Sequence, residues 1–506
     1  ASAHSLPEHE TSPDLQVLLN QAVDKITAQH NAETGGWGTA PKFPQPMILQ
    51  FLLLQAAAGD LRGLPAAEFT LREMARGGMT DLVGGGFHRY STDPRWLIPH
   101  FEKMLYDNAQ LARTYLSAYL QTGDPYYRAV CEDTLDFMLR ELRLPEGGLI
   151  ASLDADSEGE EGKYYLWTLP ELEEIFADLG ERQILTDLFE LPEQGNFEGK
   201  IILRFRPEAL FAGEDYRTAA FLHVRSVLLE KRRKRVPPAA DDKVVASWNG
   251  LALQALAEAG RYLRQPRYLK AAETLANFIQ EQMVSPVSGL VRTWRKGQPG
   301  KPGLLEDYAA VILGFLSLYQ VAPRAEYYAF AEKLRGEMQT RFQHPEQGYF
   351  DSQADETLLF RGRDVQDNAT PSGNALAAQA LMAFHAINGS TDEKDAALAA
   401  LSAAAPLIRR YPISFAVWLS AAALASQPPE SLVIAIPANM NARSEELDSV
   451  LAAYHPFRVV IQSHPDSIHQ PPGIALGKPC IDNQITYYLC RNFTCEMPVT
   501  DPRKLP

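Results

Sequence analysis

The sequence predicts a mainly α-helical fold: an (α/α)6 barrel with an inserted lid segment and a small C-terminal α/β appendage. Three observations carry this prediction. A glycine followed by an aromatic or aliphatic residue recurs at Gly36-Trp37, Gly86-Phe87, Gly148-Leu149, Gly289-Leu290 and Gly348-Tyr349. Where no insertion intervenes, these landmarks are about 50 to 60 residues apart, a period typical of repeat architectures. Apolar residues at helical spacing flank each landmark, and this pattern stops after Gln427-Pro428-Pro429.

The helical spacing predicts six hairpins of two helices each. The paired segments are 14–30 with 46–58, 66–82 with 102–121, 126–142 with 247–263, 267–283 with 306–319, 326–342 with 372–387, and 393–409 with 413–425. The second helix is the more apolar one, as in FLLLQAAA from Phe51 and VILGFLSLY from Val311. Helices that are apolar all round belong in an interior. We therefore expect a barrel over 1–430, with the loops from outer to inner helix gathered at one end.

Two further segments depart from the hairpin pattern. The third hairpin carries an insertion, 154–242, in which KYYLWT (163–168) and KIILRF (200–205) are typical of short strands with a helix between them. We expect it to act as a lid over the loop end. Beyond 430, SLVIAI (431–436) and FRVVIQ (457–462) are strand-like and flank a helical stretch, so 431–506 is predicted to be a separate α/β appendage.

Charge and hydropathy exclude two classes of partner. Lysine and arginine number 48 against 63 aspartates and glutamates, a formal net charge of −15, which argues against binding nucleic acid. The one basic run, KRRKR at 231–235, is interpreted as a solvated helix end. No apolar run approaches the roughly 20 residues that span a bilayer, and no charged-then-apolar signal opens the chain, so we expect no membrane partner.

The four cysteines are Cys131, Cys480, Cys490 and Cys495. They are too few for a disulfide scaffold and lack zinc-finger spacing. We therefore expect a cytoplasmic protein with free thiols, although Cys490 and Cys495 could pair.

The loop from Gly84 to Asn108 lies between two predicted helices and concentrates polar and aromatic groups, as binding and catalytic loops do. His88 and His100 are the strongest candidates for catalysis, because imidazole takes and gives a proton near neutral pH. The alternative for His100 is a structural hydrogen bond to the first turn of the helix that follows it.

An acidic cluster follows the third landmark, where Asp154 and Asp156 precede Glu158 and Glu161. Two such carboxylates could act as the acid and base of a glycosidase. The alternatives are a solvated turn or a calcium loop, although the twelfth position of such a loop is Tyr165 rather than glutamate. We expect neither a metal nor a cofactor.

The candidate substrate-binding residues are tryptophans, basic side chains and other polar side chains. Tryptophans could stack on a sugar ring or simply pack in the core. Basic groups could hold a carboxylate or phosphate of the ligand. The set comprises Trp37, Trp96, Trp248 and Trp294; Arg89, Arg292, Lys103 and the weaker Lys42; and Tyr106, Asp107, Asn249, Asp307 and Asn368.

Seven longer motifs carry a resemblance. They are APKFP (40–44), GGGFHRY with PHFEKMLYDNA (84–109), DADSEGEEGKYYLW (154–167), SWNGL (247–251), LEDYA (305–309), NATPSGN (368–374) and YYLCRNFTCEMPVTD (487–501). Across nearly the whole chain the sequence resembles the thioredoxin-domain-containing, spermatogenesis-associated-type family. The resemblance implies a thioredoxin-like domain upstream, with which Cys490 and Cys495 could exchange.

The remainder of that family resembles six-hairpin sugar enzymes such as N-acylglucosamine 2-epimerases and glucuronyl hydrolases. The epimerases move a proton beside a carbonyl with paired bases, one of them a histidine at the last inner helix. This chain has no histidine from Tyr411 to Trp418. The resemblance implies a carbohydrate-active enzyme that acts on a small sugar by acid/base chemistry, epimerase-like or glycosidase-like. Because His88, His100 and Asp154 occupy matching places in successive hairpins, we expect them in one site. The alternative is a non-catalytic sugar-binding or redox-partner scaffold.

Overall fold

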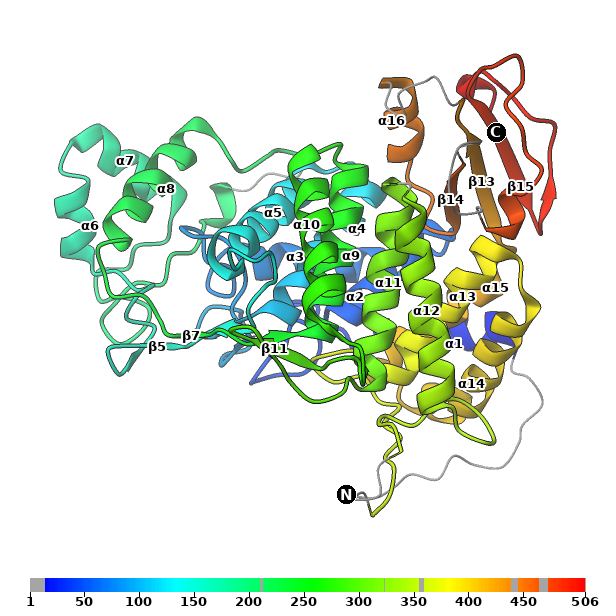
Figure 1. Cartoon of the computed structure of the whole chain (residues 1–506). Coiled ribbons are helices and arrows are strands. Elements are labelled where there is room, and N and C mark those ends of the chain that lie inside the picture. The colour runs from blue at the N-terminus through cyan, green and yellow to red at the C-terminus, as the bar shows by residue number, and fades with distance from the viewer. Residues whose placement is uncertain are drawn as a thin grey trace. The chain divides into compact units, whose positions relative to one another are not determined.

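The helices of the computed structural model follow the predicted hairpins (Figure 1). The structure describes residues 14–209, 213–322, 324–354, 359–437, 445–463 and 472–505. The six pairs are α1 (Leu15–Ala28) and α2 (Pro46–Ala57), α3 (Leu64–Ala75) and α4 (Leu105–Thr122), α5 (Pro125–Phe137) and α9 (Ala246–Tyr262), α10 (Pro266–Gln282) and α11 (Leu305–Val321), α12 (Ala325–Phe342) and α13 (Gly373–Asn388), and α14 (Thr391–Arg410) and α15 (Ala416–Ser426). A π-helical turn, Met138–Leu142, extends α5, and a 3-10 turn, Pro412–Phe415, leads into α15.

One predicted helix is too long. The expected segment 66–82 ends at Ala75, because Gly77 and Gly78 adopt φ values of +119° and +81°, which a helix cannot accommodate. The chain turns there, and Gly77 forms a bridge with Arg204 in the insertion. The residues from Thr80 onward are therefore free to build a loop instead of a last helical turn.

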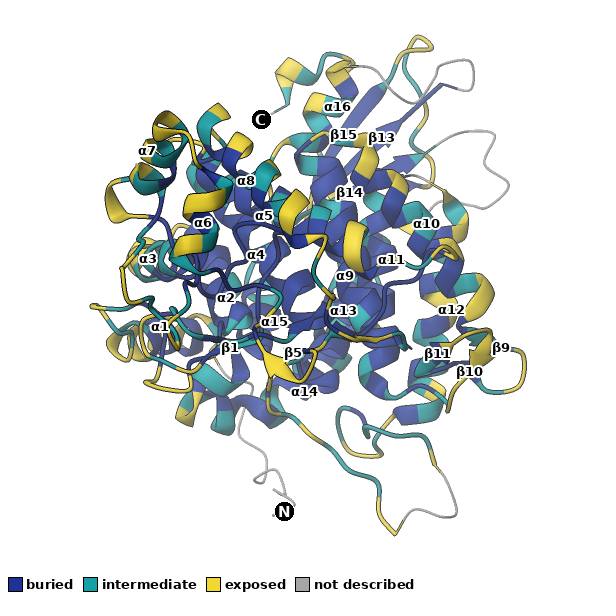
Figure 2. Ribbon diagram, turned by 90° about the vertical axis from the view of Figure 1, so that its left-hand side faces the viewer, coloured by how far each residue is buried: buried dark blue, intermediate teal, exposed yellow. Residues whose placement is uncertain are grey.

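Contacts divide the chain into two compact units. Unit 1 comprises Ala1–Lys25, Glu146–Gly148 and Val244–Pro506, and unit 2 comprises Ile26–Pro145 and Leu149–Lys243. In unit 1, α9, α11 and α13 are buried along most of their length, whereas α10 and α12 keep an exposed side (Figure 2). The backbones of α9 and α11 touch, since a Cβ on Gly314 would lie 2.8 Å from the carbonyl oxygen of Gly250. The inner helices are thus the ones that their apolar runs predicted.

The landmark glycines mark a turn that recurs in the hairpins. Bridges close it at His30↔Trp37, Thr80↔Phe87, Arg143↔Leu149 and Gln343↔Tyr349, and the strands β9 (Val284–Ser285) and β10 (Gly289–Leu290) close it in another hairpin. In two of these turns an inner-helix asparagine binds both polar groups of the landmark residue's backbone. The Asn108 amide bonds the N–H and carbonyl of Phe87 at 2.7 and 3.0 Å. The Asn374 amide bonds those of Tyr349 at 2.9 and 3.0 Å.

Short strands fix the loops of both units. In unit 2, β1 (Tyr90–Ser91) pairs with β2 (Pro99–His100), and β4 (Ser152–Leu153) pairs with β3 (Lys103–Met104) and β7 (Ala240–Asp241). A further pair joins β5 (Asp156–Ser157) to β6 (Glu160–Glu161). In unit 1, β11 (Thr293–Arg295) pairs with β8 (Val244–Val245) and β12 (Gln298–Pro299).

The insertion differs from its prediction. It contains the helices α6 (Leu169–Ile175), α7 (Leu179–Leu188) and α8 (Ala219–Arg232), but the expected strands 163–168 and 200–205 are wrong. These segments form isolated bridges, among them Trp167↔Ile201 and Phe189↔Phe205, because Phe189, Phe205, Tyr216 and Phe221 pack as an aromatic cluster rather than as a sheet.

The basic run at the end of α8 is not simply a solvated helix end. Arg232 is buried, with 3% of its surface exposed, and donates to Asp81. Arg235 donates to the carbonyls of Tyr164 and Leu166. Arg232 and Arg235 therefore anchor the end of α8 to the rest of unit 2.

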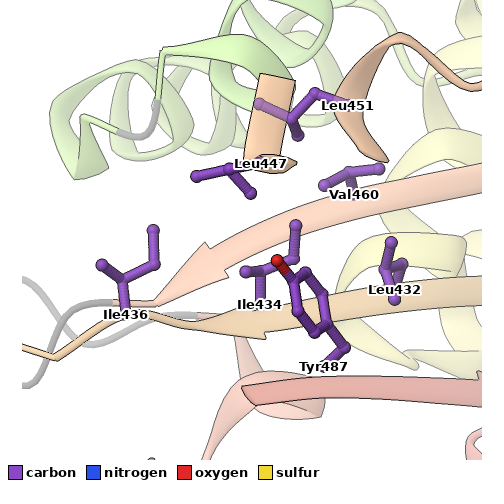
Figure 3. Close-up of a cluster of buried hydrophobic side chains, with 7 residues drawn as sticks. All are labelled: Leu432, Ile434, Ile436, Leu447, Leu451, Val460 and Tyr487. Atoms are coloured by element: carbon purple, nitrogen blue, oxygen red, sulfur yellow. The ribbon is translucent and has the colours of Figure 1, made fainter. Parts of the chain in front are cut away.

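The C-terminal segment of unit 1 folds as an α/β layer. Its four-stranded sheet has the order β14 (Arg458–Ser463), β13 (Glu430–Ala435), β15 (Thr486–Arg491), β16 (Thr494–Cys495), with β13 parallel to β14 and antiparallel to β15. Figure 3 shows α16 (Glu445–Ala452) placing Leu447 and Leu451 over apolar side chains of the sheet. The strand β15 was not predicted.

Buried polar contacts link this layer to the helices of unit 1. Arg261 of α9 donates to the carbonyl of Leu451 at 2.7 Å, and the Gln320 side chain of α11 accepts from the backbone N–H of Val460 at 3.1 Å. Ser431 donates to the carbonyl of Ala386 in α13. A domain boundary at residue 430 remains a prediction.

The expectation of free thiols at Cys490 and Cys495 is wrong, because a disulfide joins them across β15 and β16. The two cysteines lie directly opposite each other in the antiparallel register, which brings their side chains together. Cys131 and Cys480 are free thiols. Through the described ranges of the chain, no helix has the length and apolar character needed to cross a bilayer.

Candidate functional site

The central loop of unit 2 gathers a partly exposed cluster of charged side chains. The β1–β2 pairing sets His100 opposite Tyr90, and the two rings stack with centroids 5.0 Å apart. The Nδ1 atom of His100 lies 2.8 Å from Glu161 Oε1, and its Nε2 atom lies 3.8 Å from Glu102 Oε2. The side chain of His100 keeps 28% of its surface exposed. His100 is thus a solvent-accessible imidazole oriented by a carboxylate, and none of its side-chain bonds goes to the first turn of α4.

Arg89 extends this cluster toward α4. Its Nη1 atom donates to Glu102 at 3.0 Å, and its Nε atom donates to the hydroxyl of Tyr106 at 3.1 Å. Burial and the neighbouring Asp107 raise the pKa of Tyr106 above its usual range. The hydroxyl therefore stays protonated at neutral pH and can donate a hydrogen bond.

Asp107 lies in the first turn of α4 with only 4% of its surface exposed. Burial raises the pKa of its carboxyl well above the usual range, and the charge of Glu102 adds to this, while Arg89 opposes it. A helix N-terminus favours a carboxylate by about 0.3 to 1 kcal/mol. Full burial shifts a pKa by up to about 3 to 5 units, or roughly 4 to 7 kcal/mol, so burial dominates. Its Oδ2 atom has no hydrogen-bond partner among the described residues.

Aromatic side chains border the same cluster. Phe43 packs on Tyr90 with centroids 5.0 Å apart, and Tyr90 in turn stacks on His100. Phe43 is an exposed large apolar side chain. A sugar ring can stack on such an edge, because its C–H face is apolar.

His88, by contrast, is enclosed in the core of unit 2. Its Nδ1 atom lies 2.8 Å from the carbonyl oxygen of Phe101, and its ring packs against Tyr165. Burial, followed by the charge of Lys103, lowers the pKa of His88 to about 3. With a pKa near 3 and its Nδ1 atom bonded to a backbone carbonyl, His88 does not meet the expectation of an imidazole that takes and gives a proton near neutral pH.

A buried charge network lies beside His88. Asp81 accepts from Lys103 at 2.7 Å and from Arg232 at 2.8 Å. Burial alone would raise the pKa of Asp81, but the two cations outweigh it and hold that pKa well below its usual range. Burial lowers the pKa of Lys103 to about 8. With 1% exposure, Lys103 is a structural cation rather than the ligand-binding group expected from the sequence.

We expect His88 to make unit 2 sensitive to acid. An unfolded histidine titrates near pH 6.5, whereas folded His88 titrates near pH 3, so its contribution is complete above pH 6.5 and is lost as the pH falls. The free energy of unfolding of the wild type, measured in urea, should fall by about 2 kcal/mol between pH 7 and pH 5 because of this group. His88→Gln should lose correspondingly less. The control His223→Gln, at an exposed position, should show the same loss of unfolding free energy between pH 7 and pH 5 as the wild type. If His88→Gln also showed the full loss, this assignment would be contradicted.

Three other candidates of unit 2 lie in its core. Trp37 donates from Nε1 to the carbonyl of Ile26, and Trp96 donates to that of Thr34. Lys42 lies over the Trp96 ring at 4.7 Å and donates to the Thr34 hydroxyl, and burial lowers its pKa to about 8. All three side chains are at most 3% exposed, so core packing, the alternative reading of the tryptophans, accounts for them.

The acidic turn is exposed and its members diverge. Asp154 accepts from the backbone N–H of Asp156, as a turn residue does. Glu158 and Glu160 pair with Lys163 and Lys200, whereas Glu161 turns toward His100. The carboxylate that joins the histidine is therefore Glu161 rather than Asp154. In the described part of the chain, no group of three acidic, histidine or cysteine side chains is placed to hold a metal ion.

Unit 1 holds a second group of candidates at the starts of α9 and α11. Asp307 is fully buried and accepts from the backbone N–H groups of Ser247 and Leu304 and from Arg292 at 3.3 Å. Burial raises the pKa of Asp307 to about 6, although the charge of Arg292 opposes it. Arg292 also pairs with Glu306 at 2.9 Å. The hydroxyl of Ser247 is buried without a hydrogen-bond partner among the described residues.

The other candidates of unit 1 have mixed surroundings. Trp248 is half-buried, and the amide of Asn249 donates to the carbonyl of Val245. Trp294 is buried against Phe278, and Asn368 is exposed. Trp294 therefore packs in the core, whereas Trp248 and Asn368 retain accessible surface.

Sequence reasoning missed two further carboxyls of unit 1 with raised pKa values, the buried Asp367 and the half-buried Asp351. Asp367 accepts from the backbone N–H groups of Ser372 and Val417, and burial raises its pKa to about 7. Asp351 accepts from the N–H of Asp364 at 2.7 Å, and burial raises its pKa to about 6. One signal was available, since Asp367 directly precedes the motif NATPSGN.

The fold places the chain among (α/α)6-barrel proteins. A GH76 α-mannanase from Bacteroides thetaiotaomicron superimposes with a TM-score of 0.50 and 9% identity, over 81% of this chain and 96% of the mannanase. A cellobiose 2-epimerase from Spirochaeta thermophila has a TM-score of 0.47 and 14% identity, over 76% and 85% of the two chains. At 9% identity, the likeness to the mannanase shows the fold alone.

The chain belongs to the spermatogenesis-associated protein 20 family. The human protein of that name is 32% identical over 552 residues, which cover 99% of this chain and 70% of the human one. The rat protein is also 32% identical, and an uncharacterized protein of Caenorhabditis elegans is 28% identical over 93% of this chain. No family model matches the chain.

Proposed function

We propose that the chain is a carbohydrate-active enzyme that acts on a small sugar or sugar derivative by acid/base chemistry. One observation carries the proposal: Asp107, a buried carboxyl with an unpartnered oxygen, interacts with the charges of Arg89 and Glu102, and Glu102 in turn lies 3.8 Å from the accessible His100. A carboxyl with a raised pKa and an imidazole are the two kinds of group that can supply and accept a proton in such a reaction.

In this proposal Asp107 donates a proton and His100 accepts one. Glu161 holds the Nδ1 atom of the imidazole, which leaves Nε2 as the proton acceptor. In a hydrolysis, Asp107 would protonate the leaving oxygen while His100 takes a proton from the attacking water. In an epimerisation, His100 would remove the proton beside the sugar carbonyl while Asp107 protonates the carbonyl oxygen to give an enediol. The enediol hydroxyl would then return its proton to Asp107 while the carbon takes a proton from water on its opposite face, and the hydroxide left behind would take the proton from His100.

The choice of a sugar as substrate rests on two supports. The stacked edge of Phe43, Tyr90 and His100 suits the apolar face of a pyranose. The fold is also that of an α-mannanase. A panel of α-mannosides, reducing disaccharides and uronic sugars should therefore be screened by thermal shift and then by turnover. Deuterium incorporation from D2O at a carbon beside the carbonyl would identify an epimerase, and a new reducing end would identify a hydrolase.

His100→Gln is expected to reduce turnover by about 10² to 10⁴ while leaving the melting temperature nearly unchanged. Glutamine keeps a polar group of similar size near Glu161 but cannot transfer a proton. His223→Gln is the matched control, because His223 also pairs with a glutamate, Glu181, at 3.0 Å, on the exposed surface of α8. Unchanged kinetics in His100→Gln would refute the assignment and direct attention to Asp154 and Asp156.

A second candidate is a redox-partner scaffold, which the Cys490–Cys495 disulfide favours. Cys495 is only half-buried, so a dithiol could reach its sulfur. One experiment distinguishes the two functions. The double variant Cys490→Ser/Cys495→Ser should leave sugar turnover intact if the chain is an enzyme of the kind proposed above.

A further inference from the structure

A small pocket lies in unit 1 at the opposite ends of the helices whose starts carry Asp307 and Ser247. Its volume is about 220 Å³. It is lined by Gly260, Arg261, Arg264, Pro266, Leu269 and Glu273, by Val321, Ala322 and Arg324, and by Asp448, Leu451 and Gln462. Since α9 has 17 residues and rises about 1.5 Å per residue, roughly 25 Å separates this pocket from the start of α9.

Three arginines line this pocket, and only part of the hydrogen-bonding capacity of their guanidinium groups is used. Arg324 pairs with Glu273 at 3.3 Å. Arg261 is 7% exposed and donates from Nε to Leu451 and from Nη1 to Gln320 at 3.4 Å. Among the described residues, Arg264 has no side-chain hydrogen bond or ion pair. The pocket therefore offers free donors on cationic groups.

The backbone of Arg264 strengthens this point. Arg264 follows the end of α9 with a φ of +54°, in the left-handed region where glycine is the usual residue. The backbone N–H of Gln265 then bonds the carbonyl of Gly260, which closes the helix end. A position that a glycine would fill without strain carries instead a long cationic side chain beside the pocket.

The remaining charges leave the pocket net positive. Its lining includes Arg261, Arg264 and Arg324 against the two carboxylates Glu273 and Asp448, which gives 3 − 2 = +1. Glu273 is already neutralised by Arg324, so Asp448 is the one carboxylate of the lining that would oppose an anion. The start of α10 at Pro266 adds the partial positive charge of a helix N-terminus.

We propose that this pocket binds a small anion through a phosphate or carboxylate group, held by Arg261 and Arg264. The pocket is smaller than the range of about 300 to 1,000 Å³ that drug-sized ligands fill, so the ligand has few heavy atoms. Guanidinium groups bind both oxyanions in a bidentate manner. Because the lining comes from α9 to α12 on one side and from α16 and β14 on the other, the anion would fasten the C-terminal layer to these helices.

The test is a titration of the full chain with inorganic phosphate and, separately, with succinate, each at constant ionic strength set by KCl. Thermal shift and isothermal titration calorimetry should both show a saturable 1:1 stabilisation by at least one of the two probes. The probe that binds distinguishes a phosphate ligand from a carboxylate ligand. Arg264→Gln should weaken the association at least fivefold. Lys270→Gln, which removes the same charge from an exposed position of α10 outside the lining, should leave it unchanged.

Asp448→Asn provides a second, opposite signal. It removes the opposing carboxylate and should tighten binding of the same probe. The absence of saturation with both probes would overturn the proposal, as would equal weakening in Arg264→Gln and Lys270→Gln. Weaker binding in Asp448→Asn would also overturn it, because the pocket would then require a positive group on its ligand.

Discussion

Asp81→Ala is expected to lower the free energy of unfolding by about 3 to 5 kcal/mol, a large part of the roughly 5 to 15 kcal/mol that a protein of ordinary stability has. Removal of this carboxylate leaves Lys103 and Arg232 buried, 1% and 3% exposed, without their shared counter-ion. The cost comes from the two uncompensated charges rather than from a lost attraction. Urea unfolding followed by circular dichroism measures it directly.

Two variants make this prediction specific. Arg206→Ala breaks an exposed pair with Glu208, 3.8 Å apart, and should change stability by less than about 0.5 kcal/mol. The triple change Asp81→Leu/Lys103→Met/Arg232→Met removes all three charges and should recover much of the loss. If Asp81→Ala behaved like the surface variant, the network would be more hydrated than its burial indicates.

Asp107→Asn is expected to lower sugar turnover by about 10² to 10⁴, because asparagine cannot supply a proton. The same variant should be at least as stable as the wild type. The folded pKa of Asp107 lies above its unfolded value, so its favourable contribution is present at low pH and is lost as the pH rises through the folded pKa. The difference in melting temperature between variant and wild type should therefore grow toward alkaline pH.

Asp154→Asn is the matched control, since it makes the same chemical change on the exposed turn. It should alter neither turnover nor the pH dependence of stability. If the kcat of the wild type declines at alkaline pH and every variant of unit 2 keeps this decline, the role of Asp107 is contradicted. A combined loss of activity and stability in Asp107→Asn would indicate a packing residue rather than a proton donor.

Local pattern was sufficient to predict the helices. The bounds of α2, α10 and α12 fall within one residue of the predicted segments, because apolar spacing and a proline at the start of α2 and α10 are local signals. The end of α3 was misjudged because apolar residues continue past Gly77, where the backbone leaves the helix.

The side chains of the site were harder to predict, because burial is set by partners remote in sequence. Spacing could not show that His88 is enclosed by Phe101 and Tyr165 while His100 meets Glu161. Nor could it show that Arg232, within a basic run, bonds to Asp81 far earlier in the chain. The disulfide was missed for a similar reason, since β15 was not predicted and its register with β16 was therefore unknown.

The hydrogen bonds of Asn108 to the backbone of Phe87, and of Asn374 to that of Tyr349, form two asparagine clamps. These clamps affect how the sequence of such a chain can diversify. Each clamp fixes the direction of the backbone just after the turn, with a single amide of the inner helix. The residues between the clamped position and the start of that helix are therefore not needed to fix the backbone direction. Insertions and substitutions can accumulate there without tilting the hairpin, so new specificities can arise by exchange of loop sequence on an unchanged frame.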